Sequence, residues 1–179
     1  MNSQSLPTKM RMPLTRMRED VMHEGDVQAV DTESLQTVFN GTSHAGRRVI
    51  VDHKNALDQV FPTARAKNVS FVIGSSLNAG FISGSTRYNY GKESYKIPPA
   101  FLEKRKRLRA VASNHGVDLR TAALQFSAAP DVAAALVVGA SSEQQILADY
   151  TSMQTKIPAE FWAELKAQNL IEQNAPVPA

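Results

Sequence analysis

At 179 residues the chain is long enough for one domain with a sizeable hydrophobic core. It contains no cysteine, which excludes disulfides, thiolate metal sites and cysteine nucleophiles, and no metal site is predicted. The net charge of +3 is too small to indicate a nucleic-acid partner by itself. No segment approaches the roughly 20 apolar residues that cross a bilayer, and residues 1–18 lack the apolar core of a secretory signal. We therefore expect a soluble cytoplasmic protein with no membrane partner. Four basic residues leave a mitochondrial-type presequence open (Lys9, Arg11, Arg16 and Arg18).

The first 44 residues have no steady hydrophobic period. We predict only a short helix at 32–39 there, and otherwise treat residues 1–44 as an unassigned segment for which disorder remains open. Residues 48–51 form a short β-branched run that is typical of a strand. Residues 55–66 carry apolar side chains at helical spacing, but Pro62 predicts a break or an early turn.

Two segments read as buried strands, at 69–73 and 132–138, and each is followed or ended by a glycine. Helices are predicted at 99–114, at 118–129, where Asp118 is the cap and Pro130 the stop, at 141–153 and at 158–169. Strands that alternate with helices and lack hairpin signals pair in parallel through crossover helices. The sequence therefore predicts an α/β fold.

The strand at 132–138 runs into Gly139-Ala140-Ser141-Ser142, where a helix begins. Ser141 with Gln144, or Ser142 with Gln145, has capping-box spacing. The free amides and dipole of a helix N-terminus make an anion site, and glycine lets a phosphate approach the backbone. The more common alternative is an ordinary capped helix that binds nothing.

Residues 74–84 follow the other strand and contain three glycines and three serines. The carboxyl ends of parallel strands form the ligand-binding face of α/β sheets and barrels. Backbone amides of such a loop suit a pyrophosphate, although a flexible turn is an equally good reading of this segment alone.

Both segments resemble the last two strand-end loops of the aldo/keto reductases. Residues 75–82, Ser-Ser-Leu-Asn-Ala-Gly-Phe-Ile, resemble that family's Ser-Pro-Leu-x-x-Gly-Leu-Leu loop after its seventh strand. Gly139-Ala140-Ser141, followed by Gln145 and Asp149, resembles the cofactor motif after the eighth strand. Residues 157–165 resemble the closing helix of the branch that contains aldose 1-dehydrogenases and pyridoxal 4-dehydrogenases. The resemblance extends from residue 45 to the end, about three-quarters of the chain.

This resemblance implies a (β/α)8 TIM barrel, a nicotinamide dinucleotide and hydride transfer to or from a carbonyl or sugar carbon. Because a complete barrel needs about 250 residues, we expect residues 45–179 to be an incomplete, C-terminal portion of one. By match, Ser75 and Leu77 would contact the pyrophosphate, and Gln145 and Asp149 would lie near the adenine. The full set of cofactor-binding residues implied by the match is Ser75, Leu77, Asn78, Gly80, Gly139, Ala140, Ser141, Ser142, Gln145 and Asp149.

Two departures from the family pattern limit the inference. The family commonly has Arg or Lys at the position of Ser142, where it pairs with the 2′-phosphate of NADP. The neutral serine therefore slightly favours NAD over NADP. The family's catalytic Asp, Tyr, Lys and His come from earlier strands, and no segment in 1–44 resembles those strands. We assign no catalytic residue. His44, His53, Lys92 and Tyr95 are poor candidates, and Tyr88 or Tyr90 would flank the substrate by the same resemblance.

Residues 104–109 form a basic run that raises a nucleic-acid interpretation. The run lies on a predicted helix, and no aromatic residues are interleaved with it, so a solvated helix face is the better reading and no nucleic-acid partner is predicted.

Two hypotheses remain. The first is an aldo/keto reductase chain of the aldose or aldehyde/alcohol class that retains the cofactor cradle without a recognisable catalytic tetrad, and is inactive alone. Its small carbonyl or sugar substrate would bind only if missing barrel strands completed the site. The alternative is a non-catalytic dinucleotide-binding or interaction protein derived from the same fold. For the first hypothesis, unpaired parallel strands predict marginal stability, or dependence on a missing part or a partner.

Overall fold

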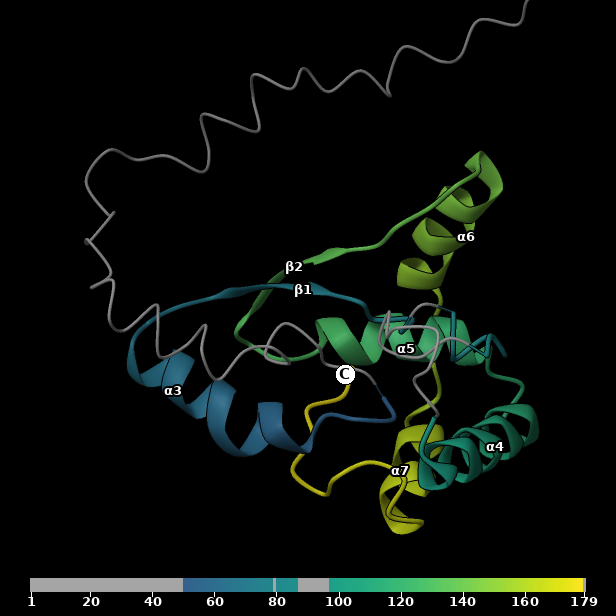
Figure 1. The fold of residues 1–179 in the computed structure, drawn as a ribbon, viewed down its shortest axis with the longest axis horizontal. Coiled ribbons are helices and arrows are strands. Elements are labelled where there is room, and N and C mark those ends of the chain that lie inside the picture. The colour runs from purple at the N-terminus through teal and green to yellow at the C-terminus, as the bar shows by residue number, and fades with distance from the viewer. Residues whose placement is uncertain (1–49, 79, 87–96, 179) are drawn as a thin grey trace, which may run out of the picture. The chain divides into compact units, whose positions relative to one another are not determined.

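The computed structural model describes residues 50–78, 80–86 and 97–178 (Figure 1). Several predictions lie outside these residues. They concern the segment 1–44 with its helix at 32–39, the first half of the strand at 48–51, and the side chains of His44, Tyr88, Tyr90, Lys92 and Tyr95.

The two predicted strands form a parallel pair, β1 (Phe71–Gly74) and β2 (Ala133–Val137). Phe71 pairs with Ala133 and Val72 with Ala135, so Ala134 is an extra residue in β2 and forms a bulge. Two helices connect the strands, as predicted for a crossover between parallel neighbours. The described part of the chain is thus α/β, with the strand pairing that the sequence predicted.

The prediction that both strands are buried was wrong for one of their faces. Ile73 is completely buried, but its neighbour Val72 is 58% exposed and Val137 is 61% exposed. Successive side chains of a strand point to opposite faces. Helices α3 (Phe61–Ala66) and α5 (Leu119–Ala128) lie along one side of the strand pair in Figure 1. In the described residues, the apolar side chains of the strands therefore lie on two faces, one covered by helices and one open.

The segment before β1 is a continuous helical stretch with a wide turn. A π-helical turn, η2 (Ala56–Val60), leads directly into α3, and Pro62 lies in the first turn of α3. Proline lacks the N–H that an α-helix interior needs and clashes with the carbonyl one turn back. The π-helical turn lies just before Pro62. The predicted break is therefore observed as a change from π-helix to α-helix.

The predicted strand at 48–51 is also wrong where it is described. Ile50 and Val51 lie in a turn and belong to the core, with exposures of 0% and 1%. Their β-branched, apolar character reflects burial under the helices and not pairing in a sheet.

The remaining helices follow the prediction closely: α4 (Pro99–Asn114), α5, α6 (Glu143–Gln154) and α7 (Ala159–Ala167). Asp118 caps α5, with its carboxylate accepting hydrogen bonds from the amides of Arg120 and Thr121. Within the described residues no helix is long and apolar enough to cross a membrane.

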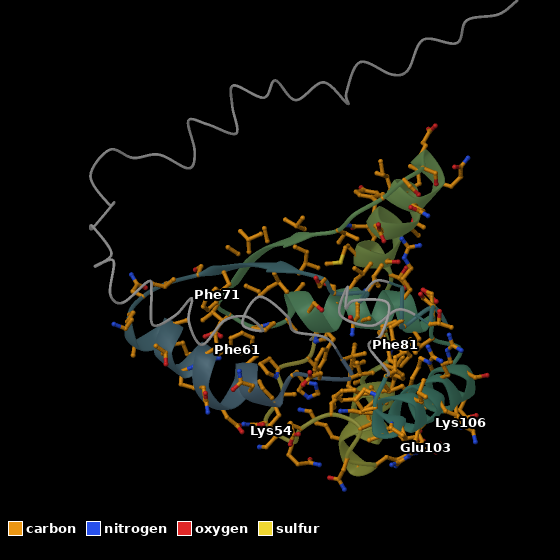
Figure 2. All side chains as sticks on the ribbon, in the orientation of Figure 1. Lys54, Phe61, Phe71, Phe81, Glu103 and Lys106 are labelled. Atoms are coloured by element: carbon orange, nitrogen blue, oxygen red, sulfur yellow. The ribbon has the colours of Figure 1, made fainter. Side chains whose placement is uncertain are left out.

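A chain of aromatic rings links the helices in the core. Phe126 of α5 stacks on Trp162 of α7 with centroids 6.2 Å apart, and Trp162 meets the edge of Phe161 at 4.9 Å. His53 packs edge-on against Phe126 at 4.9 Å. Such ring pairs add stability beyond the apolar area they bury. Figure 2 shows the side chains that fill the space between the helices, with Phe61 at the start of α3.

Truncating the two neighbouring side chains of β1 should have very different effects. Ile73→Ala should lower the free energy of unfolding by about 2–5 kcal/mol, because it opens a cavity in the covered face. Val72→Ala, the matched control on the open face, should change it by less than about 0.5 kcal/mol. Urea unfolding followed by Trp162 fluorescence measures both. An equally large loss for Val72→Ala would mean that its face is covered in solution.

Candidate functional site

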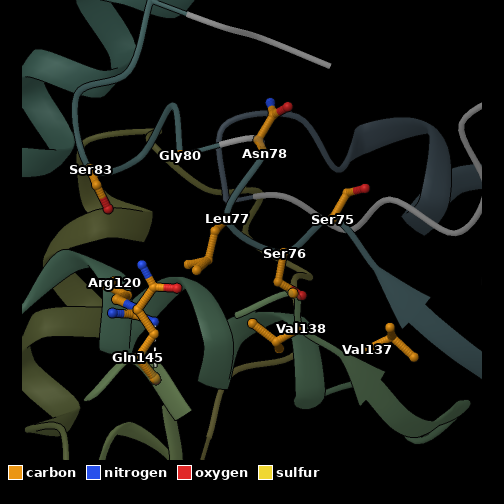
Figure 3. A pocket seen from close by; sticks show the side chains of 11 residues that line it. Ser75, Ser76, Leu77, Asn78, Gly80, Ser83, Arg120, Val137, Val138 and Gln145 are labelled. Atoms are coloured by element: carbon orange, nitrogen blue, oxygen red, sulfur yellow. Dashed lines mark hydrogen bonds between the residues drawn. The ribbon is translucent and has the colours of Figure 1, made fainter. Parts of the chain in front are cut away.

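A cavity of about 380 Å³ lies where the two strands end (Figure 3). Its walls come from the loop after β1, from the end of β2, from the first turn of α5 and from the first turn of α6. The lining residues are Ser75, Ser76, Leu77, Asn78, Gly80, Ser83, Arg120, Val137, Val138, Gly139 and Gln145. Sequence-distant segments thus meet at the carboxyl edge of a parallel strand pair, where ligands bind in α/β folds.

The loop after β1 is a series of tight turns with an unusual backbone. Ser75 and Asn78 have left-handed φ values of 60° and 49°. The left-handed region is uncommon for residues other than glycine, although asparagine tolerates it better than most. The amide of Asn78 donates to the carbonyl of Ser75 at 2.8 Å, which closes the first turn. The loop therefore presents its backbone in a fixed, curled form.

Two arginines of α4 hold this loop in place. Arg105 donates through Nη1 to the carbonyl of Phe81 at 2.9 Å and to that of Ser85 at 3.2 Å, and its guanidinium lies 4.3 Å from the Phe81 ring centroid. Arg109 donates through Nη2 to the carbonyl of Ile82 at 3.1 Å. Burial, and then the neighbouring charge of Arg109, lower the pKa of Arg105 from its usual value.

The basic run is therefore only partly a solvated face. Lys106 is exposed on the outer side of α4, as predicted, and Glu103 lies on the same outer side (Figure 2). Arg107 donates to the carbonyl of Gln168 beyond α7 at 3.0 Å. The arginines of the run mainly attach α4 to its neighbours, a role that the sequence pattern alone did not reveal.

The N-terminus of α6 forms the opposite wall. Ser142 is the cap, and its Oγ accepts a hydrogen bond from the Gln145 amide at 3.3 Å. The side chain of Gln145 returns to accept from the Ser141 amide at 2.7 Å. Of the two predicted capping pairs, Ser142 with Gln145 forms, with the return bond shifted by one residue.

Polar contacts, more than apolar ones, attach α6 to α5. Arg120 Nη2 donates to Asp149 Oδ1 at 2.5 Å, and Thr121 Oγ1 bonds Ser152 Oγ at 3.0 Å. Gln125 Nε2 donates to the carbonyls of Ser152 and Thr155 at 2.7 and 2.6 Å. We refer to this set of contacts as the α5–α6 seam. It fixes where the first turn of α6 lies relative to the end of β2.

Six of the ten predicted cofactor-binding residues line the cavity: Ser75, Leu77, Asn78, Gly80, Gly139 and Gln145. Ala140, Ser141 and Ser142 are exposed and are not among its lining residues. Asp149 is also absent from the lining, and its carboxylate is the partner of Arg120 in the seam.

Sequence reasoning missed Arg120, Ser76 and Ser83 as lining residues. Ser76 and Ser83 lay inside the predicted loop but were not selected. Arg120 carried a signal, because a cation in the first turn of a helix lies at the positive end of the helix dipole, where it is unfavourable. His53, a weak catalytic candidate, is buried beside Phe126 and accepts the amide of Glu172 at 3.2 Å, away from the cavity lining.

Parallel strands joined by helices, with a cavity at their carboxyl ends, define an α/β protein of the kind that binds ligands at strand ends. A model of the aldo/keto reductase family matches residues 44–169. The chain belongs to the aldo/keto reductase family, whose domains are (β/α)8 barrels and whose enzymes use NAD(P)H.

Two relatives support the same branch. D-threo-aldose 1-dehydrogenase of Pseudomonas sp is 30% identical over 169 residues, which cover 86% of this chain and 50% of that protein. Pyridoxal 4-dehydrogenase of Microbacterium luteolum is 25% identical over 131 residues, which cover 71% of this chain and 37% of that protein. The matches span half or less of the relatives' length, and they confirm the resemblance drawn from the sequence.

The glycine at position 84 should prove necessary for the shape of the loop. It has a φ of +110°, and a Cβ there would lie 2.9 Å from Arg109 Nη2, the atom that bonds the Ile82 carbonyl. Gly84→Ala should therefore cost about 1–2 kcal/mol for the backbone and about 1 kcal/mol more for the broken hydrogen bond.

Gly116→Ala is the matched control, since Gly116 also has a positive φ but open space around its Cβ position. Chemical denaturation should show the larger loss for Gly84→Ala. A Gly116→Ala loss that equals or exceeds it would contradict the contact between Gly84 and Arg109.

Proposed function

We propose that this chain carries the dinucleotide cradle of an aldo/keto reductase and binds NAD(P)H in the cavity between the loop after β1 and the first turn of α6. The observation that carries the proposal is the meeting of both predicted phosphate segments in one cavity, although they are about sixty residues apart in the sequence. Bound there, the cofactor would supply a hydride for carbonyl reduction.

The residues present fit a dinucleotide. A Cβ built on Gly139 meets nothing within 4 Å, so the fold itself does not require glycine at this position. The open space at Gly139 lies in the cavity wall, where it allows a phosphate oxygen close to the backbone. The Gln145 amide is bonded by the Ser142 cap, but the two amides before it, of Glu143 and Gln144, belong to the part of a helix that has no acceptor one turn back, and the helix dipole favours a negative charge there.

The cavity also contains a buried donor. Ser76 is 2% exposed, and its Oγ has no hydrogen-bond partner among the described residues. A buried hydroxyl without a partner costs stability, so such groups commonly serve a ligand or a water molecule. The cavity thus combines an uncovered glycine, a helix N-terminus and a buried hydroxyl, which together suit phosphate oxygens.

We further propose that the chain does not turn over a substrate by itself. Among the described residues that line the cavity there is no Asp, Tyr, Lys or His, the four types of the family's catalytic tetrad. A proton donor for carbonyl reduction must lie within hydrogen-bond reach of the reacting oxygen. The alternative function is that of a non-catalytic dinucleotide-binding protein. Such a protein would bind the cofactor in the same cavity but would take part in no reaction.

Calorimetric titration of the full chain with NADH and NADPH tests the cradle. Gly139→Ala should leave the free energy of unfolding within about 0.5 kcal/mol but weaken binding by about ten- to a hundredfold, because its methyl group fills the space of the ligand. Gly74→Ala is the control, since its Cβ position is also open but it does not line the cavity. Equal affinities for all three proteins would refute this site.

An assay of NAD⁺ reduction with an aldose, and separately with pyridoxal, tests the second half of the proposal. These substrates follow from the names of the two relatives. The full chain should bind the cofactor and give no turnover. Turnover by this chain would contradict the claim of inactivity while leaving the cradle in place.

A further inference from the structure

Arg120 occupies a position that helix stability does not explain. It is the second residue of α5, where the partial positive charge of the helix N-terminus disfavours a cation. Asp118, the cap of the same helix, accepts from the Arg120 amide and not from its guanidinium. The side chain extends instead into the wall of the cavity, next to Gln145 (Figure 3).

Arg120 is the one charged side chain among the described residues that line this cavity. Its carboxylate partner Asp149 is not a lining residue, so the cavity is exposed to the cation and not to the anion. Among the described residues, the guanidinium donates through Nη2 to Asp149 Oδ1 at 2.5 Å and to the Gln145 carbonyl at 3.5 Å. A guanidinium has five N–H donors. Nε is buried and has no partner among the described residues.

A second observation points to an anion at the same place. Ser76, whose buried hydroxyl has no partner among the described residues, lines the same cavity as Arg120. The cavity therefore has a hydroxyl donor from the loop after β1 and a cation from α5.

We propose that Arg120 is the cation that recognises a phosphate group of the dinucleotide, with Ser76 as a second donor to it. This rests on the proposed function and deepens it. The family pattern has a cation at the position of Ser142. In this chain the cation would come instead from α5, as Arg120, which is paired with Asp149. If that phosphate is the 2′-phosphate of NADP, Arg120 determines cofactor specificity and the neutral Ser142 no longer argues for NAD. The phosphate is either the diphosphate common to both cofactors or the 2′-phosphate of NADP.

Arg120→Gln and Arg120→Lys are compared with the wild-type chain by calorimetric titration with NADH, NADPH and inorganic pyrophosphate. Arg120→Gln should weaken binding by about ten- to a hundredfold, and Arg120→Lys should restore part of the loss because it keeps the charge without the fork. The wild-type affinity should fall with added salt, and the fall should be smaller for Arg120→Gln. Arg107→Gln, which removes an arginine that does not line the cavity, should bind like wild type.

The choice of titrant identifies the phosphate. A loss that is equal for NADH, NADPH and pyrophosphate assigns Arg120 to the diphosphate, whereas a loss for NADPH alone assigns it to the 2′-phosphate. Unchanged affinities for all three in Arg120→Gln overturn the proposal while leaving the cradle intact. If the wild type binds pyrophosphate through Arg120 but neither dinucleotide, the phosphate site stands and the proposed function fails. If it binds none of the three, both fail.

Asp149→Asn separates phosphate recognition from a purely structural role in the α5–α6 seam. This variant removes the ion pair but keeps the guanidinium. If Arg120 binds phosphate, Asp149→Asn should retain the salt-dependent affinity that Arg120→Gln loses, even if both lower the melting temperature. If the two variants lose affinity equally, Arg120 acts only by holding α6, and the proposal is wrong.

Discussion

The α5–α6 seam is the interaction on which the rest of the site depends. The apolar residues of α6, such as Ile146 and Tyr150, are 60% and 67% exposed, so hydrophobic burial contributes little to its position. The seam instead uses an ion pair and hydrogen bonds that are directional, so they set the orientation of α6 as well as its distance from α5. Phe126 packs in the core and fixes the position of α5. The seam therefore also fixes the first turn of α6 at the end of β2.

The other wall of the cavity depends on a second set of polar contacts from a different helix. Arg105 and Arg109 of α4 bond the carbonyls of the loop after β1, and that loop contains left-handed residues that do not hold their shape without support. Both walls are therefore positioned by helices packed in one core, while the strands between them keep an open apolar face. The cavity is thus supported by helices in a fold whose sheet has two described strands.

Much of this could be read from the sequence because it depends on local chemistry. The Asp118 and Ser142 caps, the parallel strands and the glycine-rich turns all follow from neighbouring residues. The predictions that were wrong concern tertiary packing. A run such as Ile50-Val51 is apolar whether it lies in a strand or in a buried turn, and the exposure of Val72 depends on elements elsewhere. The pairing of Arg120 with Asp149 was missed because the two residues are 29 positions apart, although the unfavourable place of Arg120 at a helix N-terminus was visible in the sequence.

The proposed cradle requires the loop after β1 and the first turn of α6 to bind one ligand together. Hydrogen exchange of the full chain is therefore measured by mass spectrometry with and without NADPH. NADPH should slow exchange in both 74–84 and 138–146, while α7 exchanges at the same rate as before. Protection of only one of the two segments, or of neither at saturating NADPH, would contradict the claim.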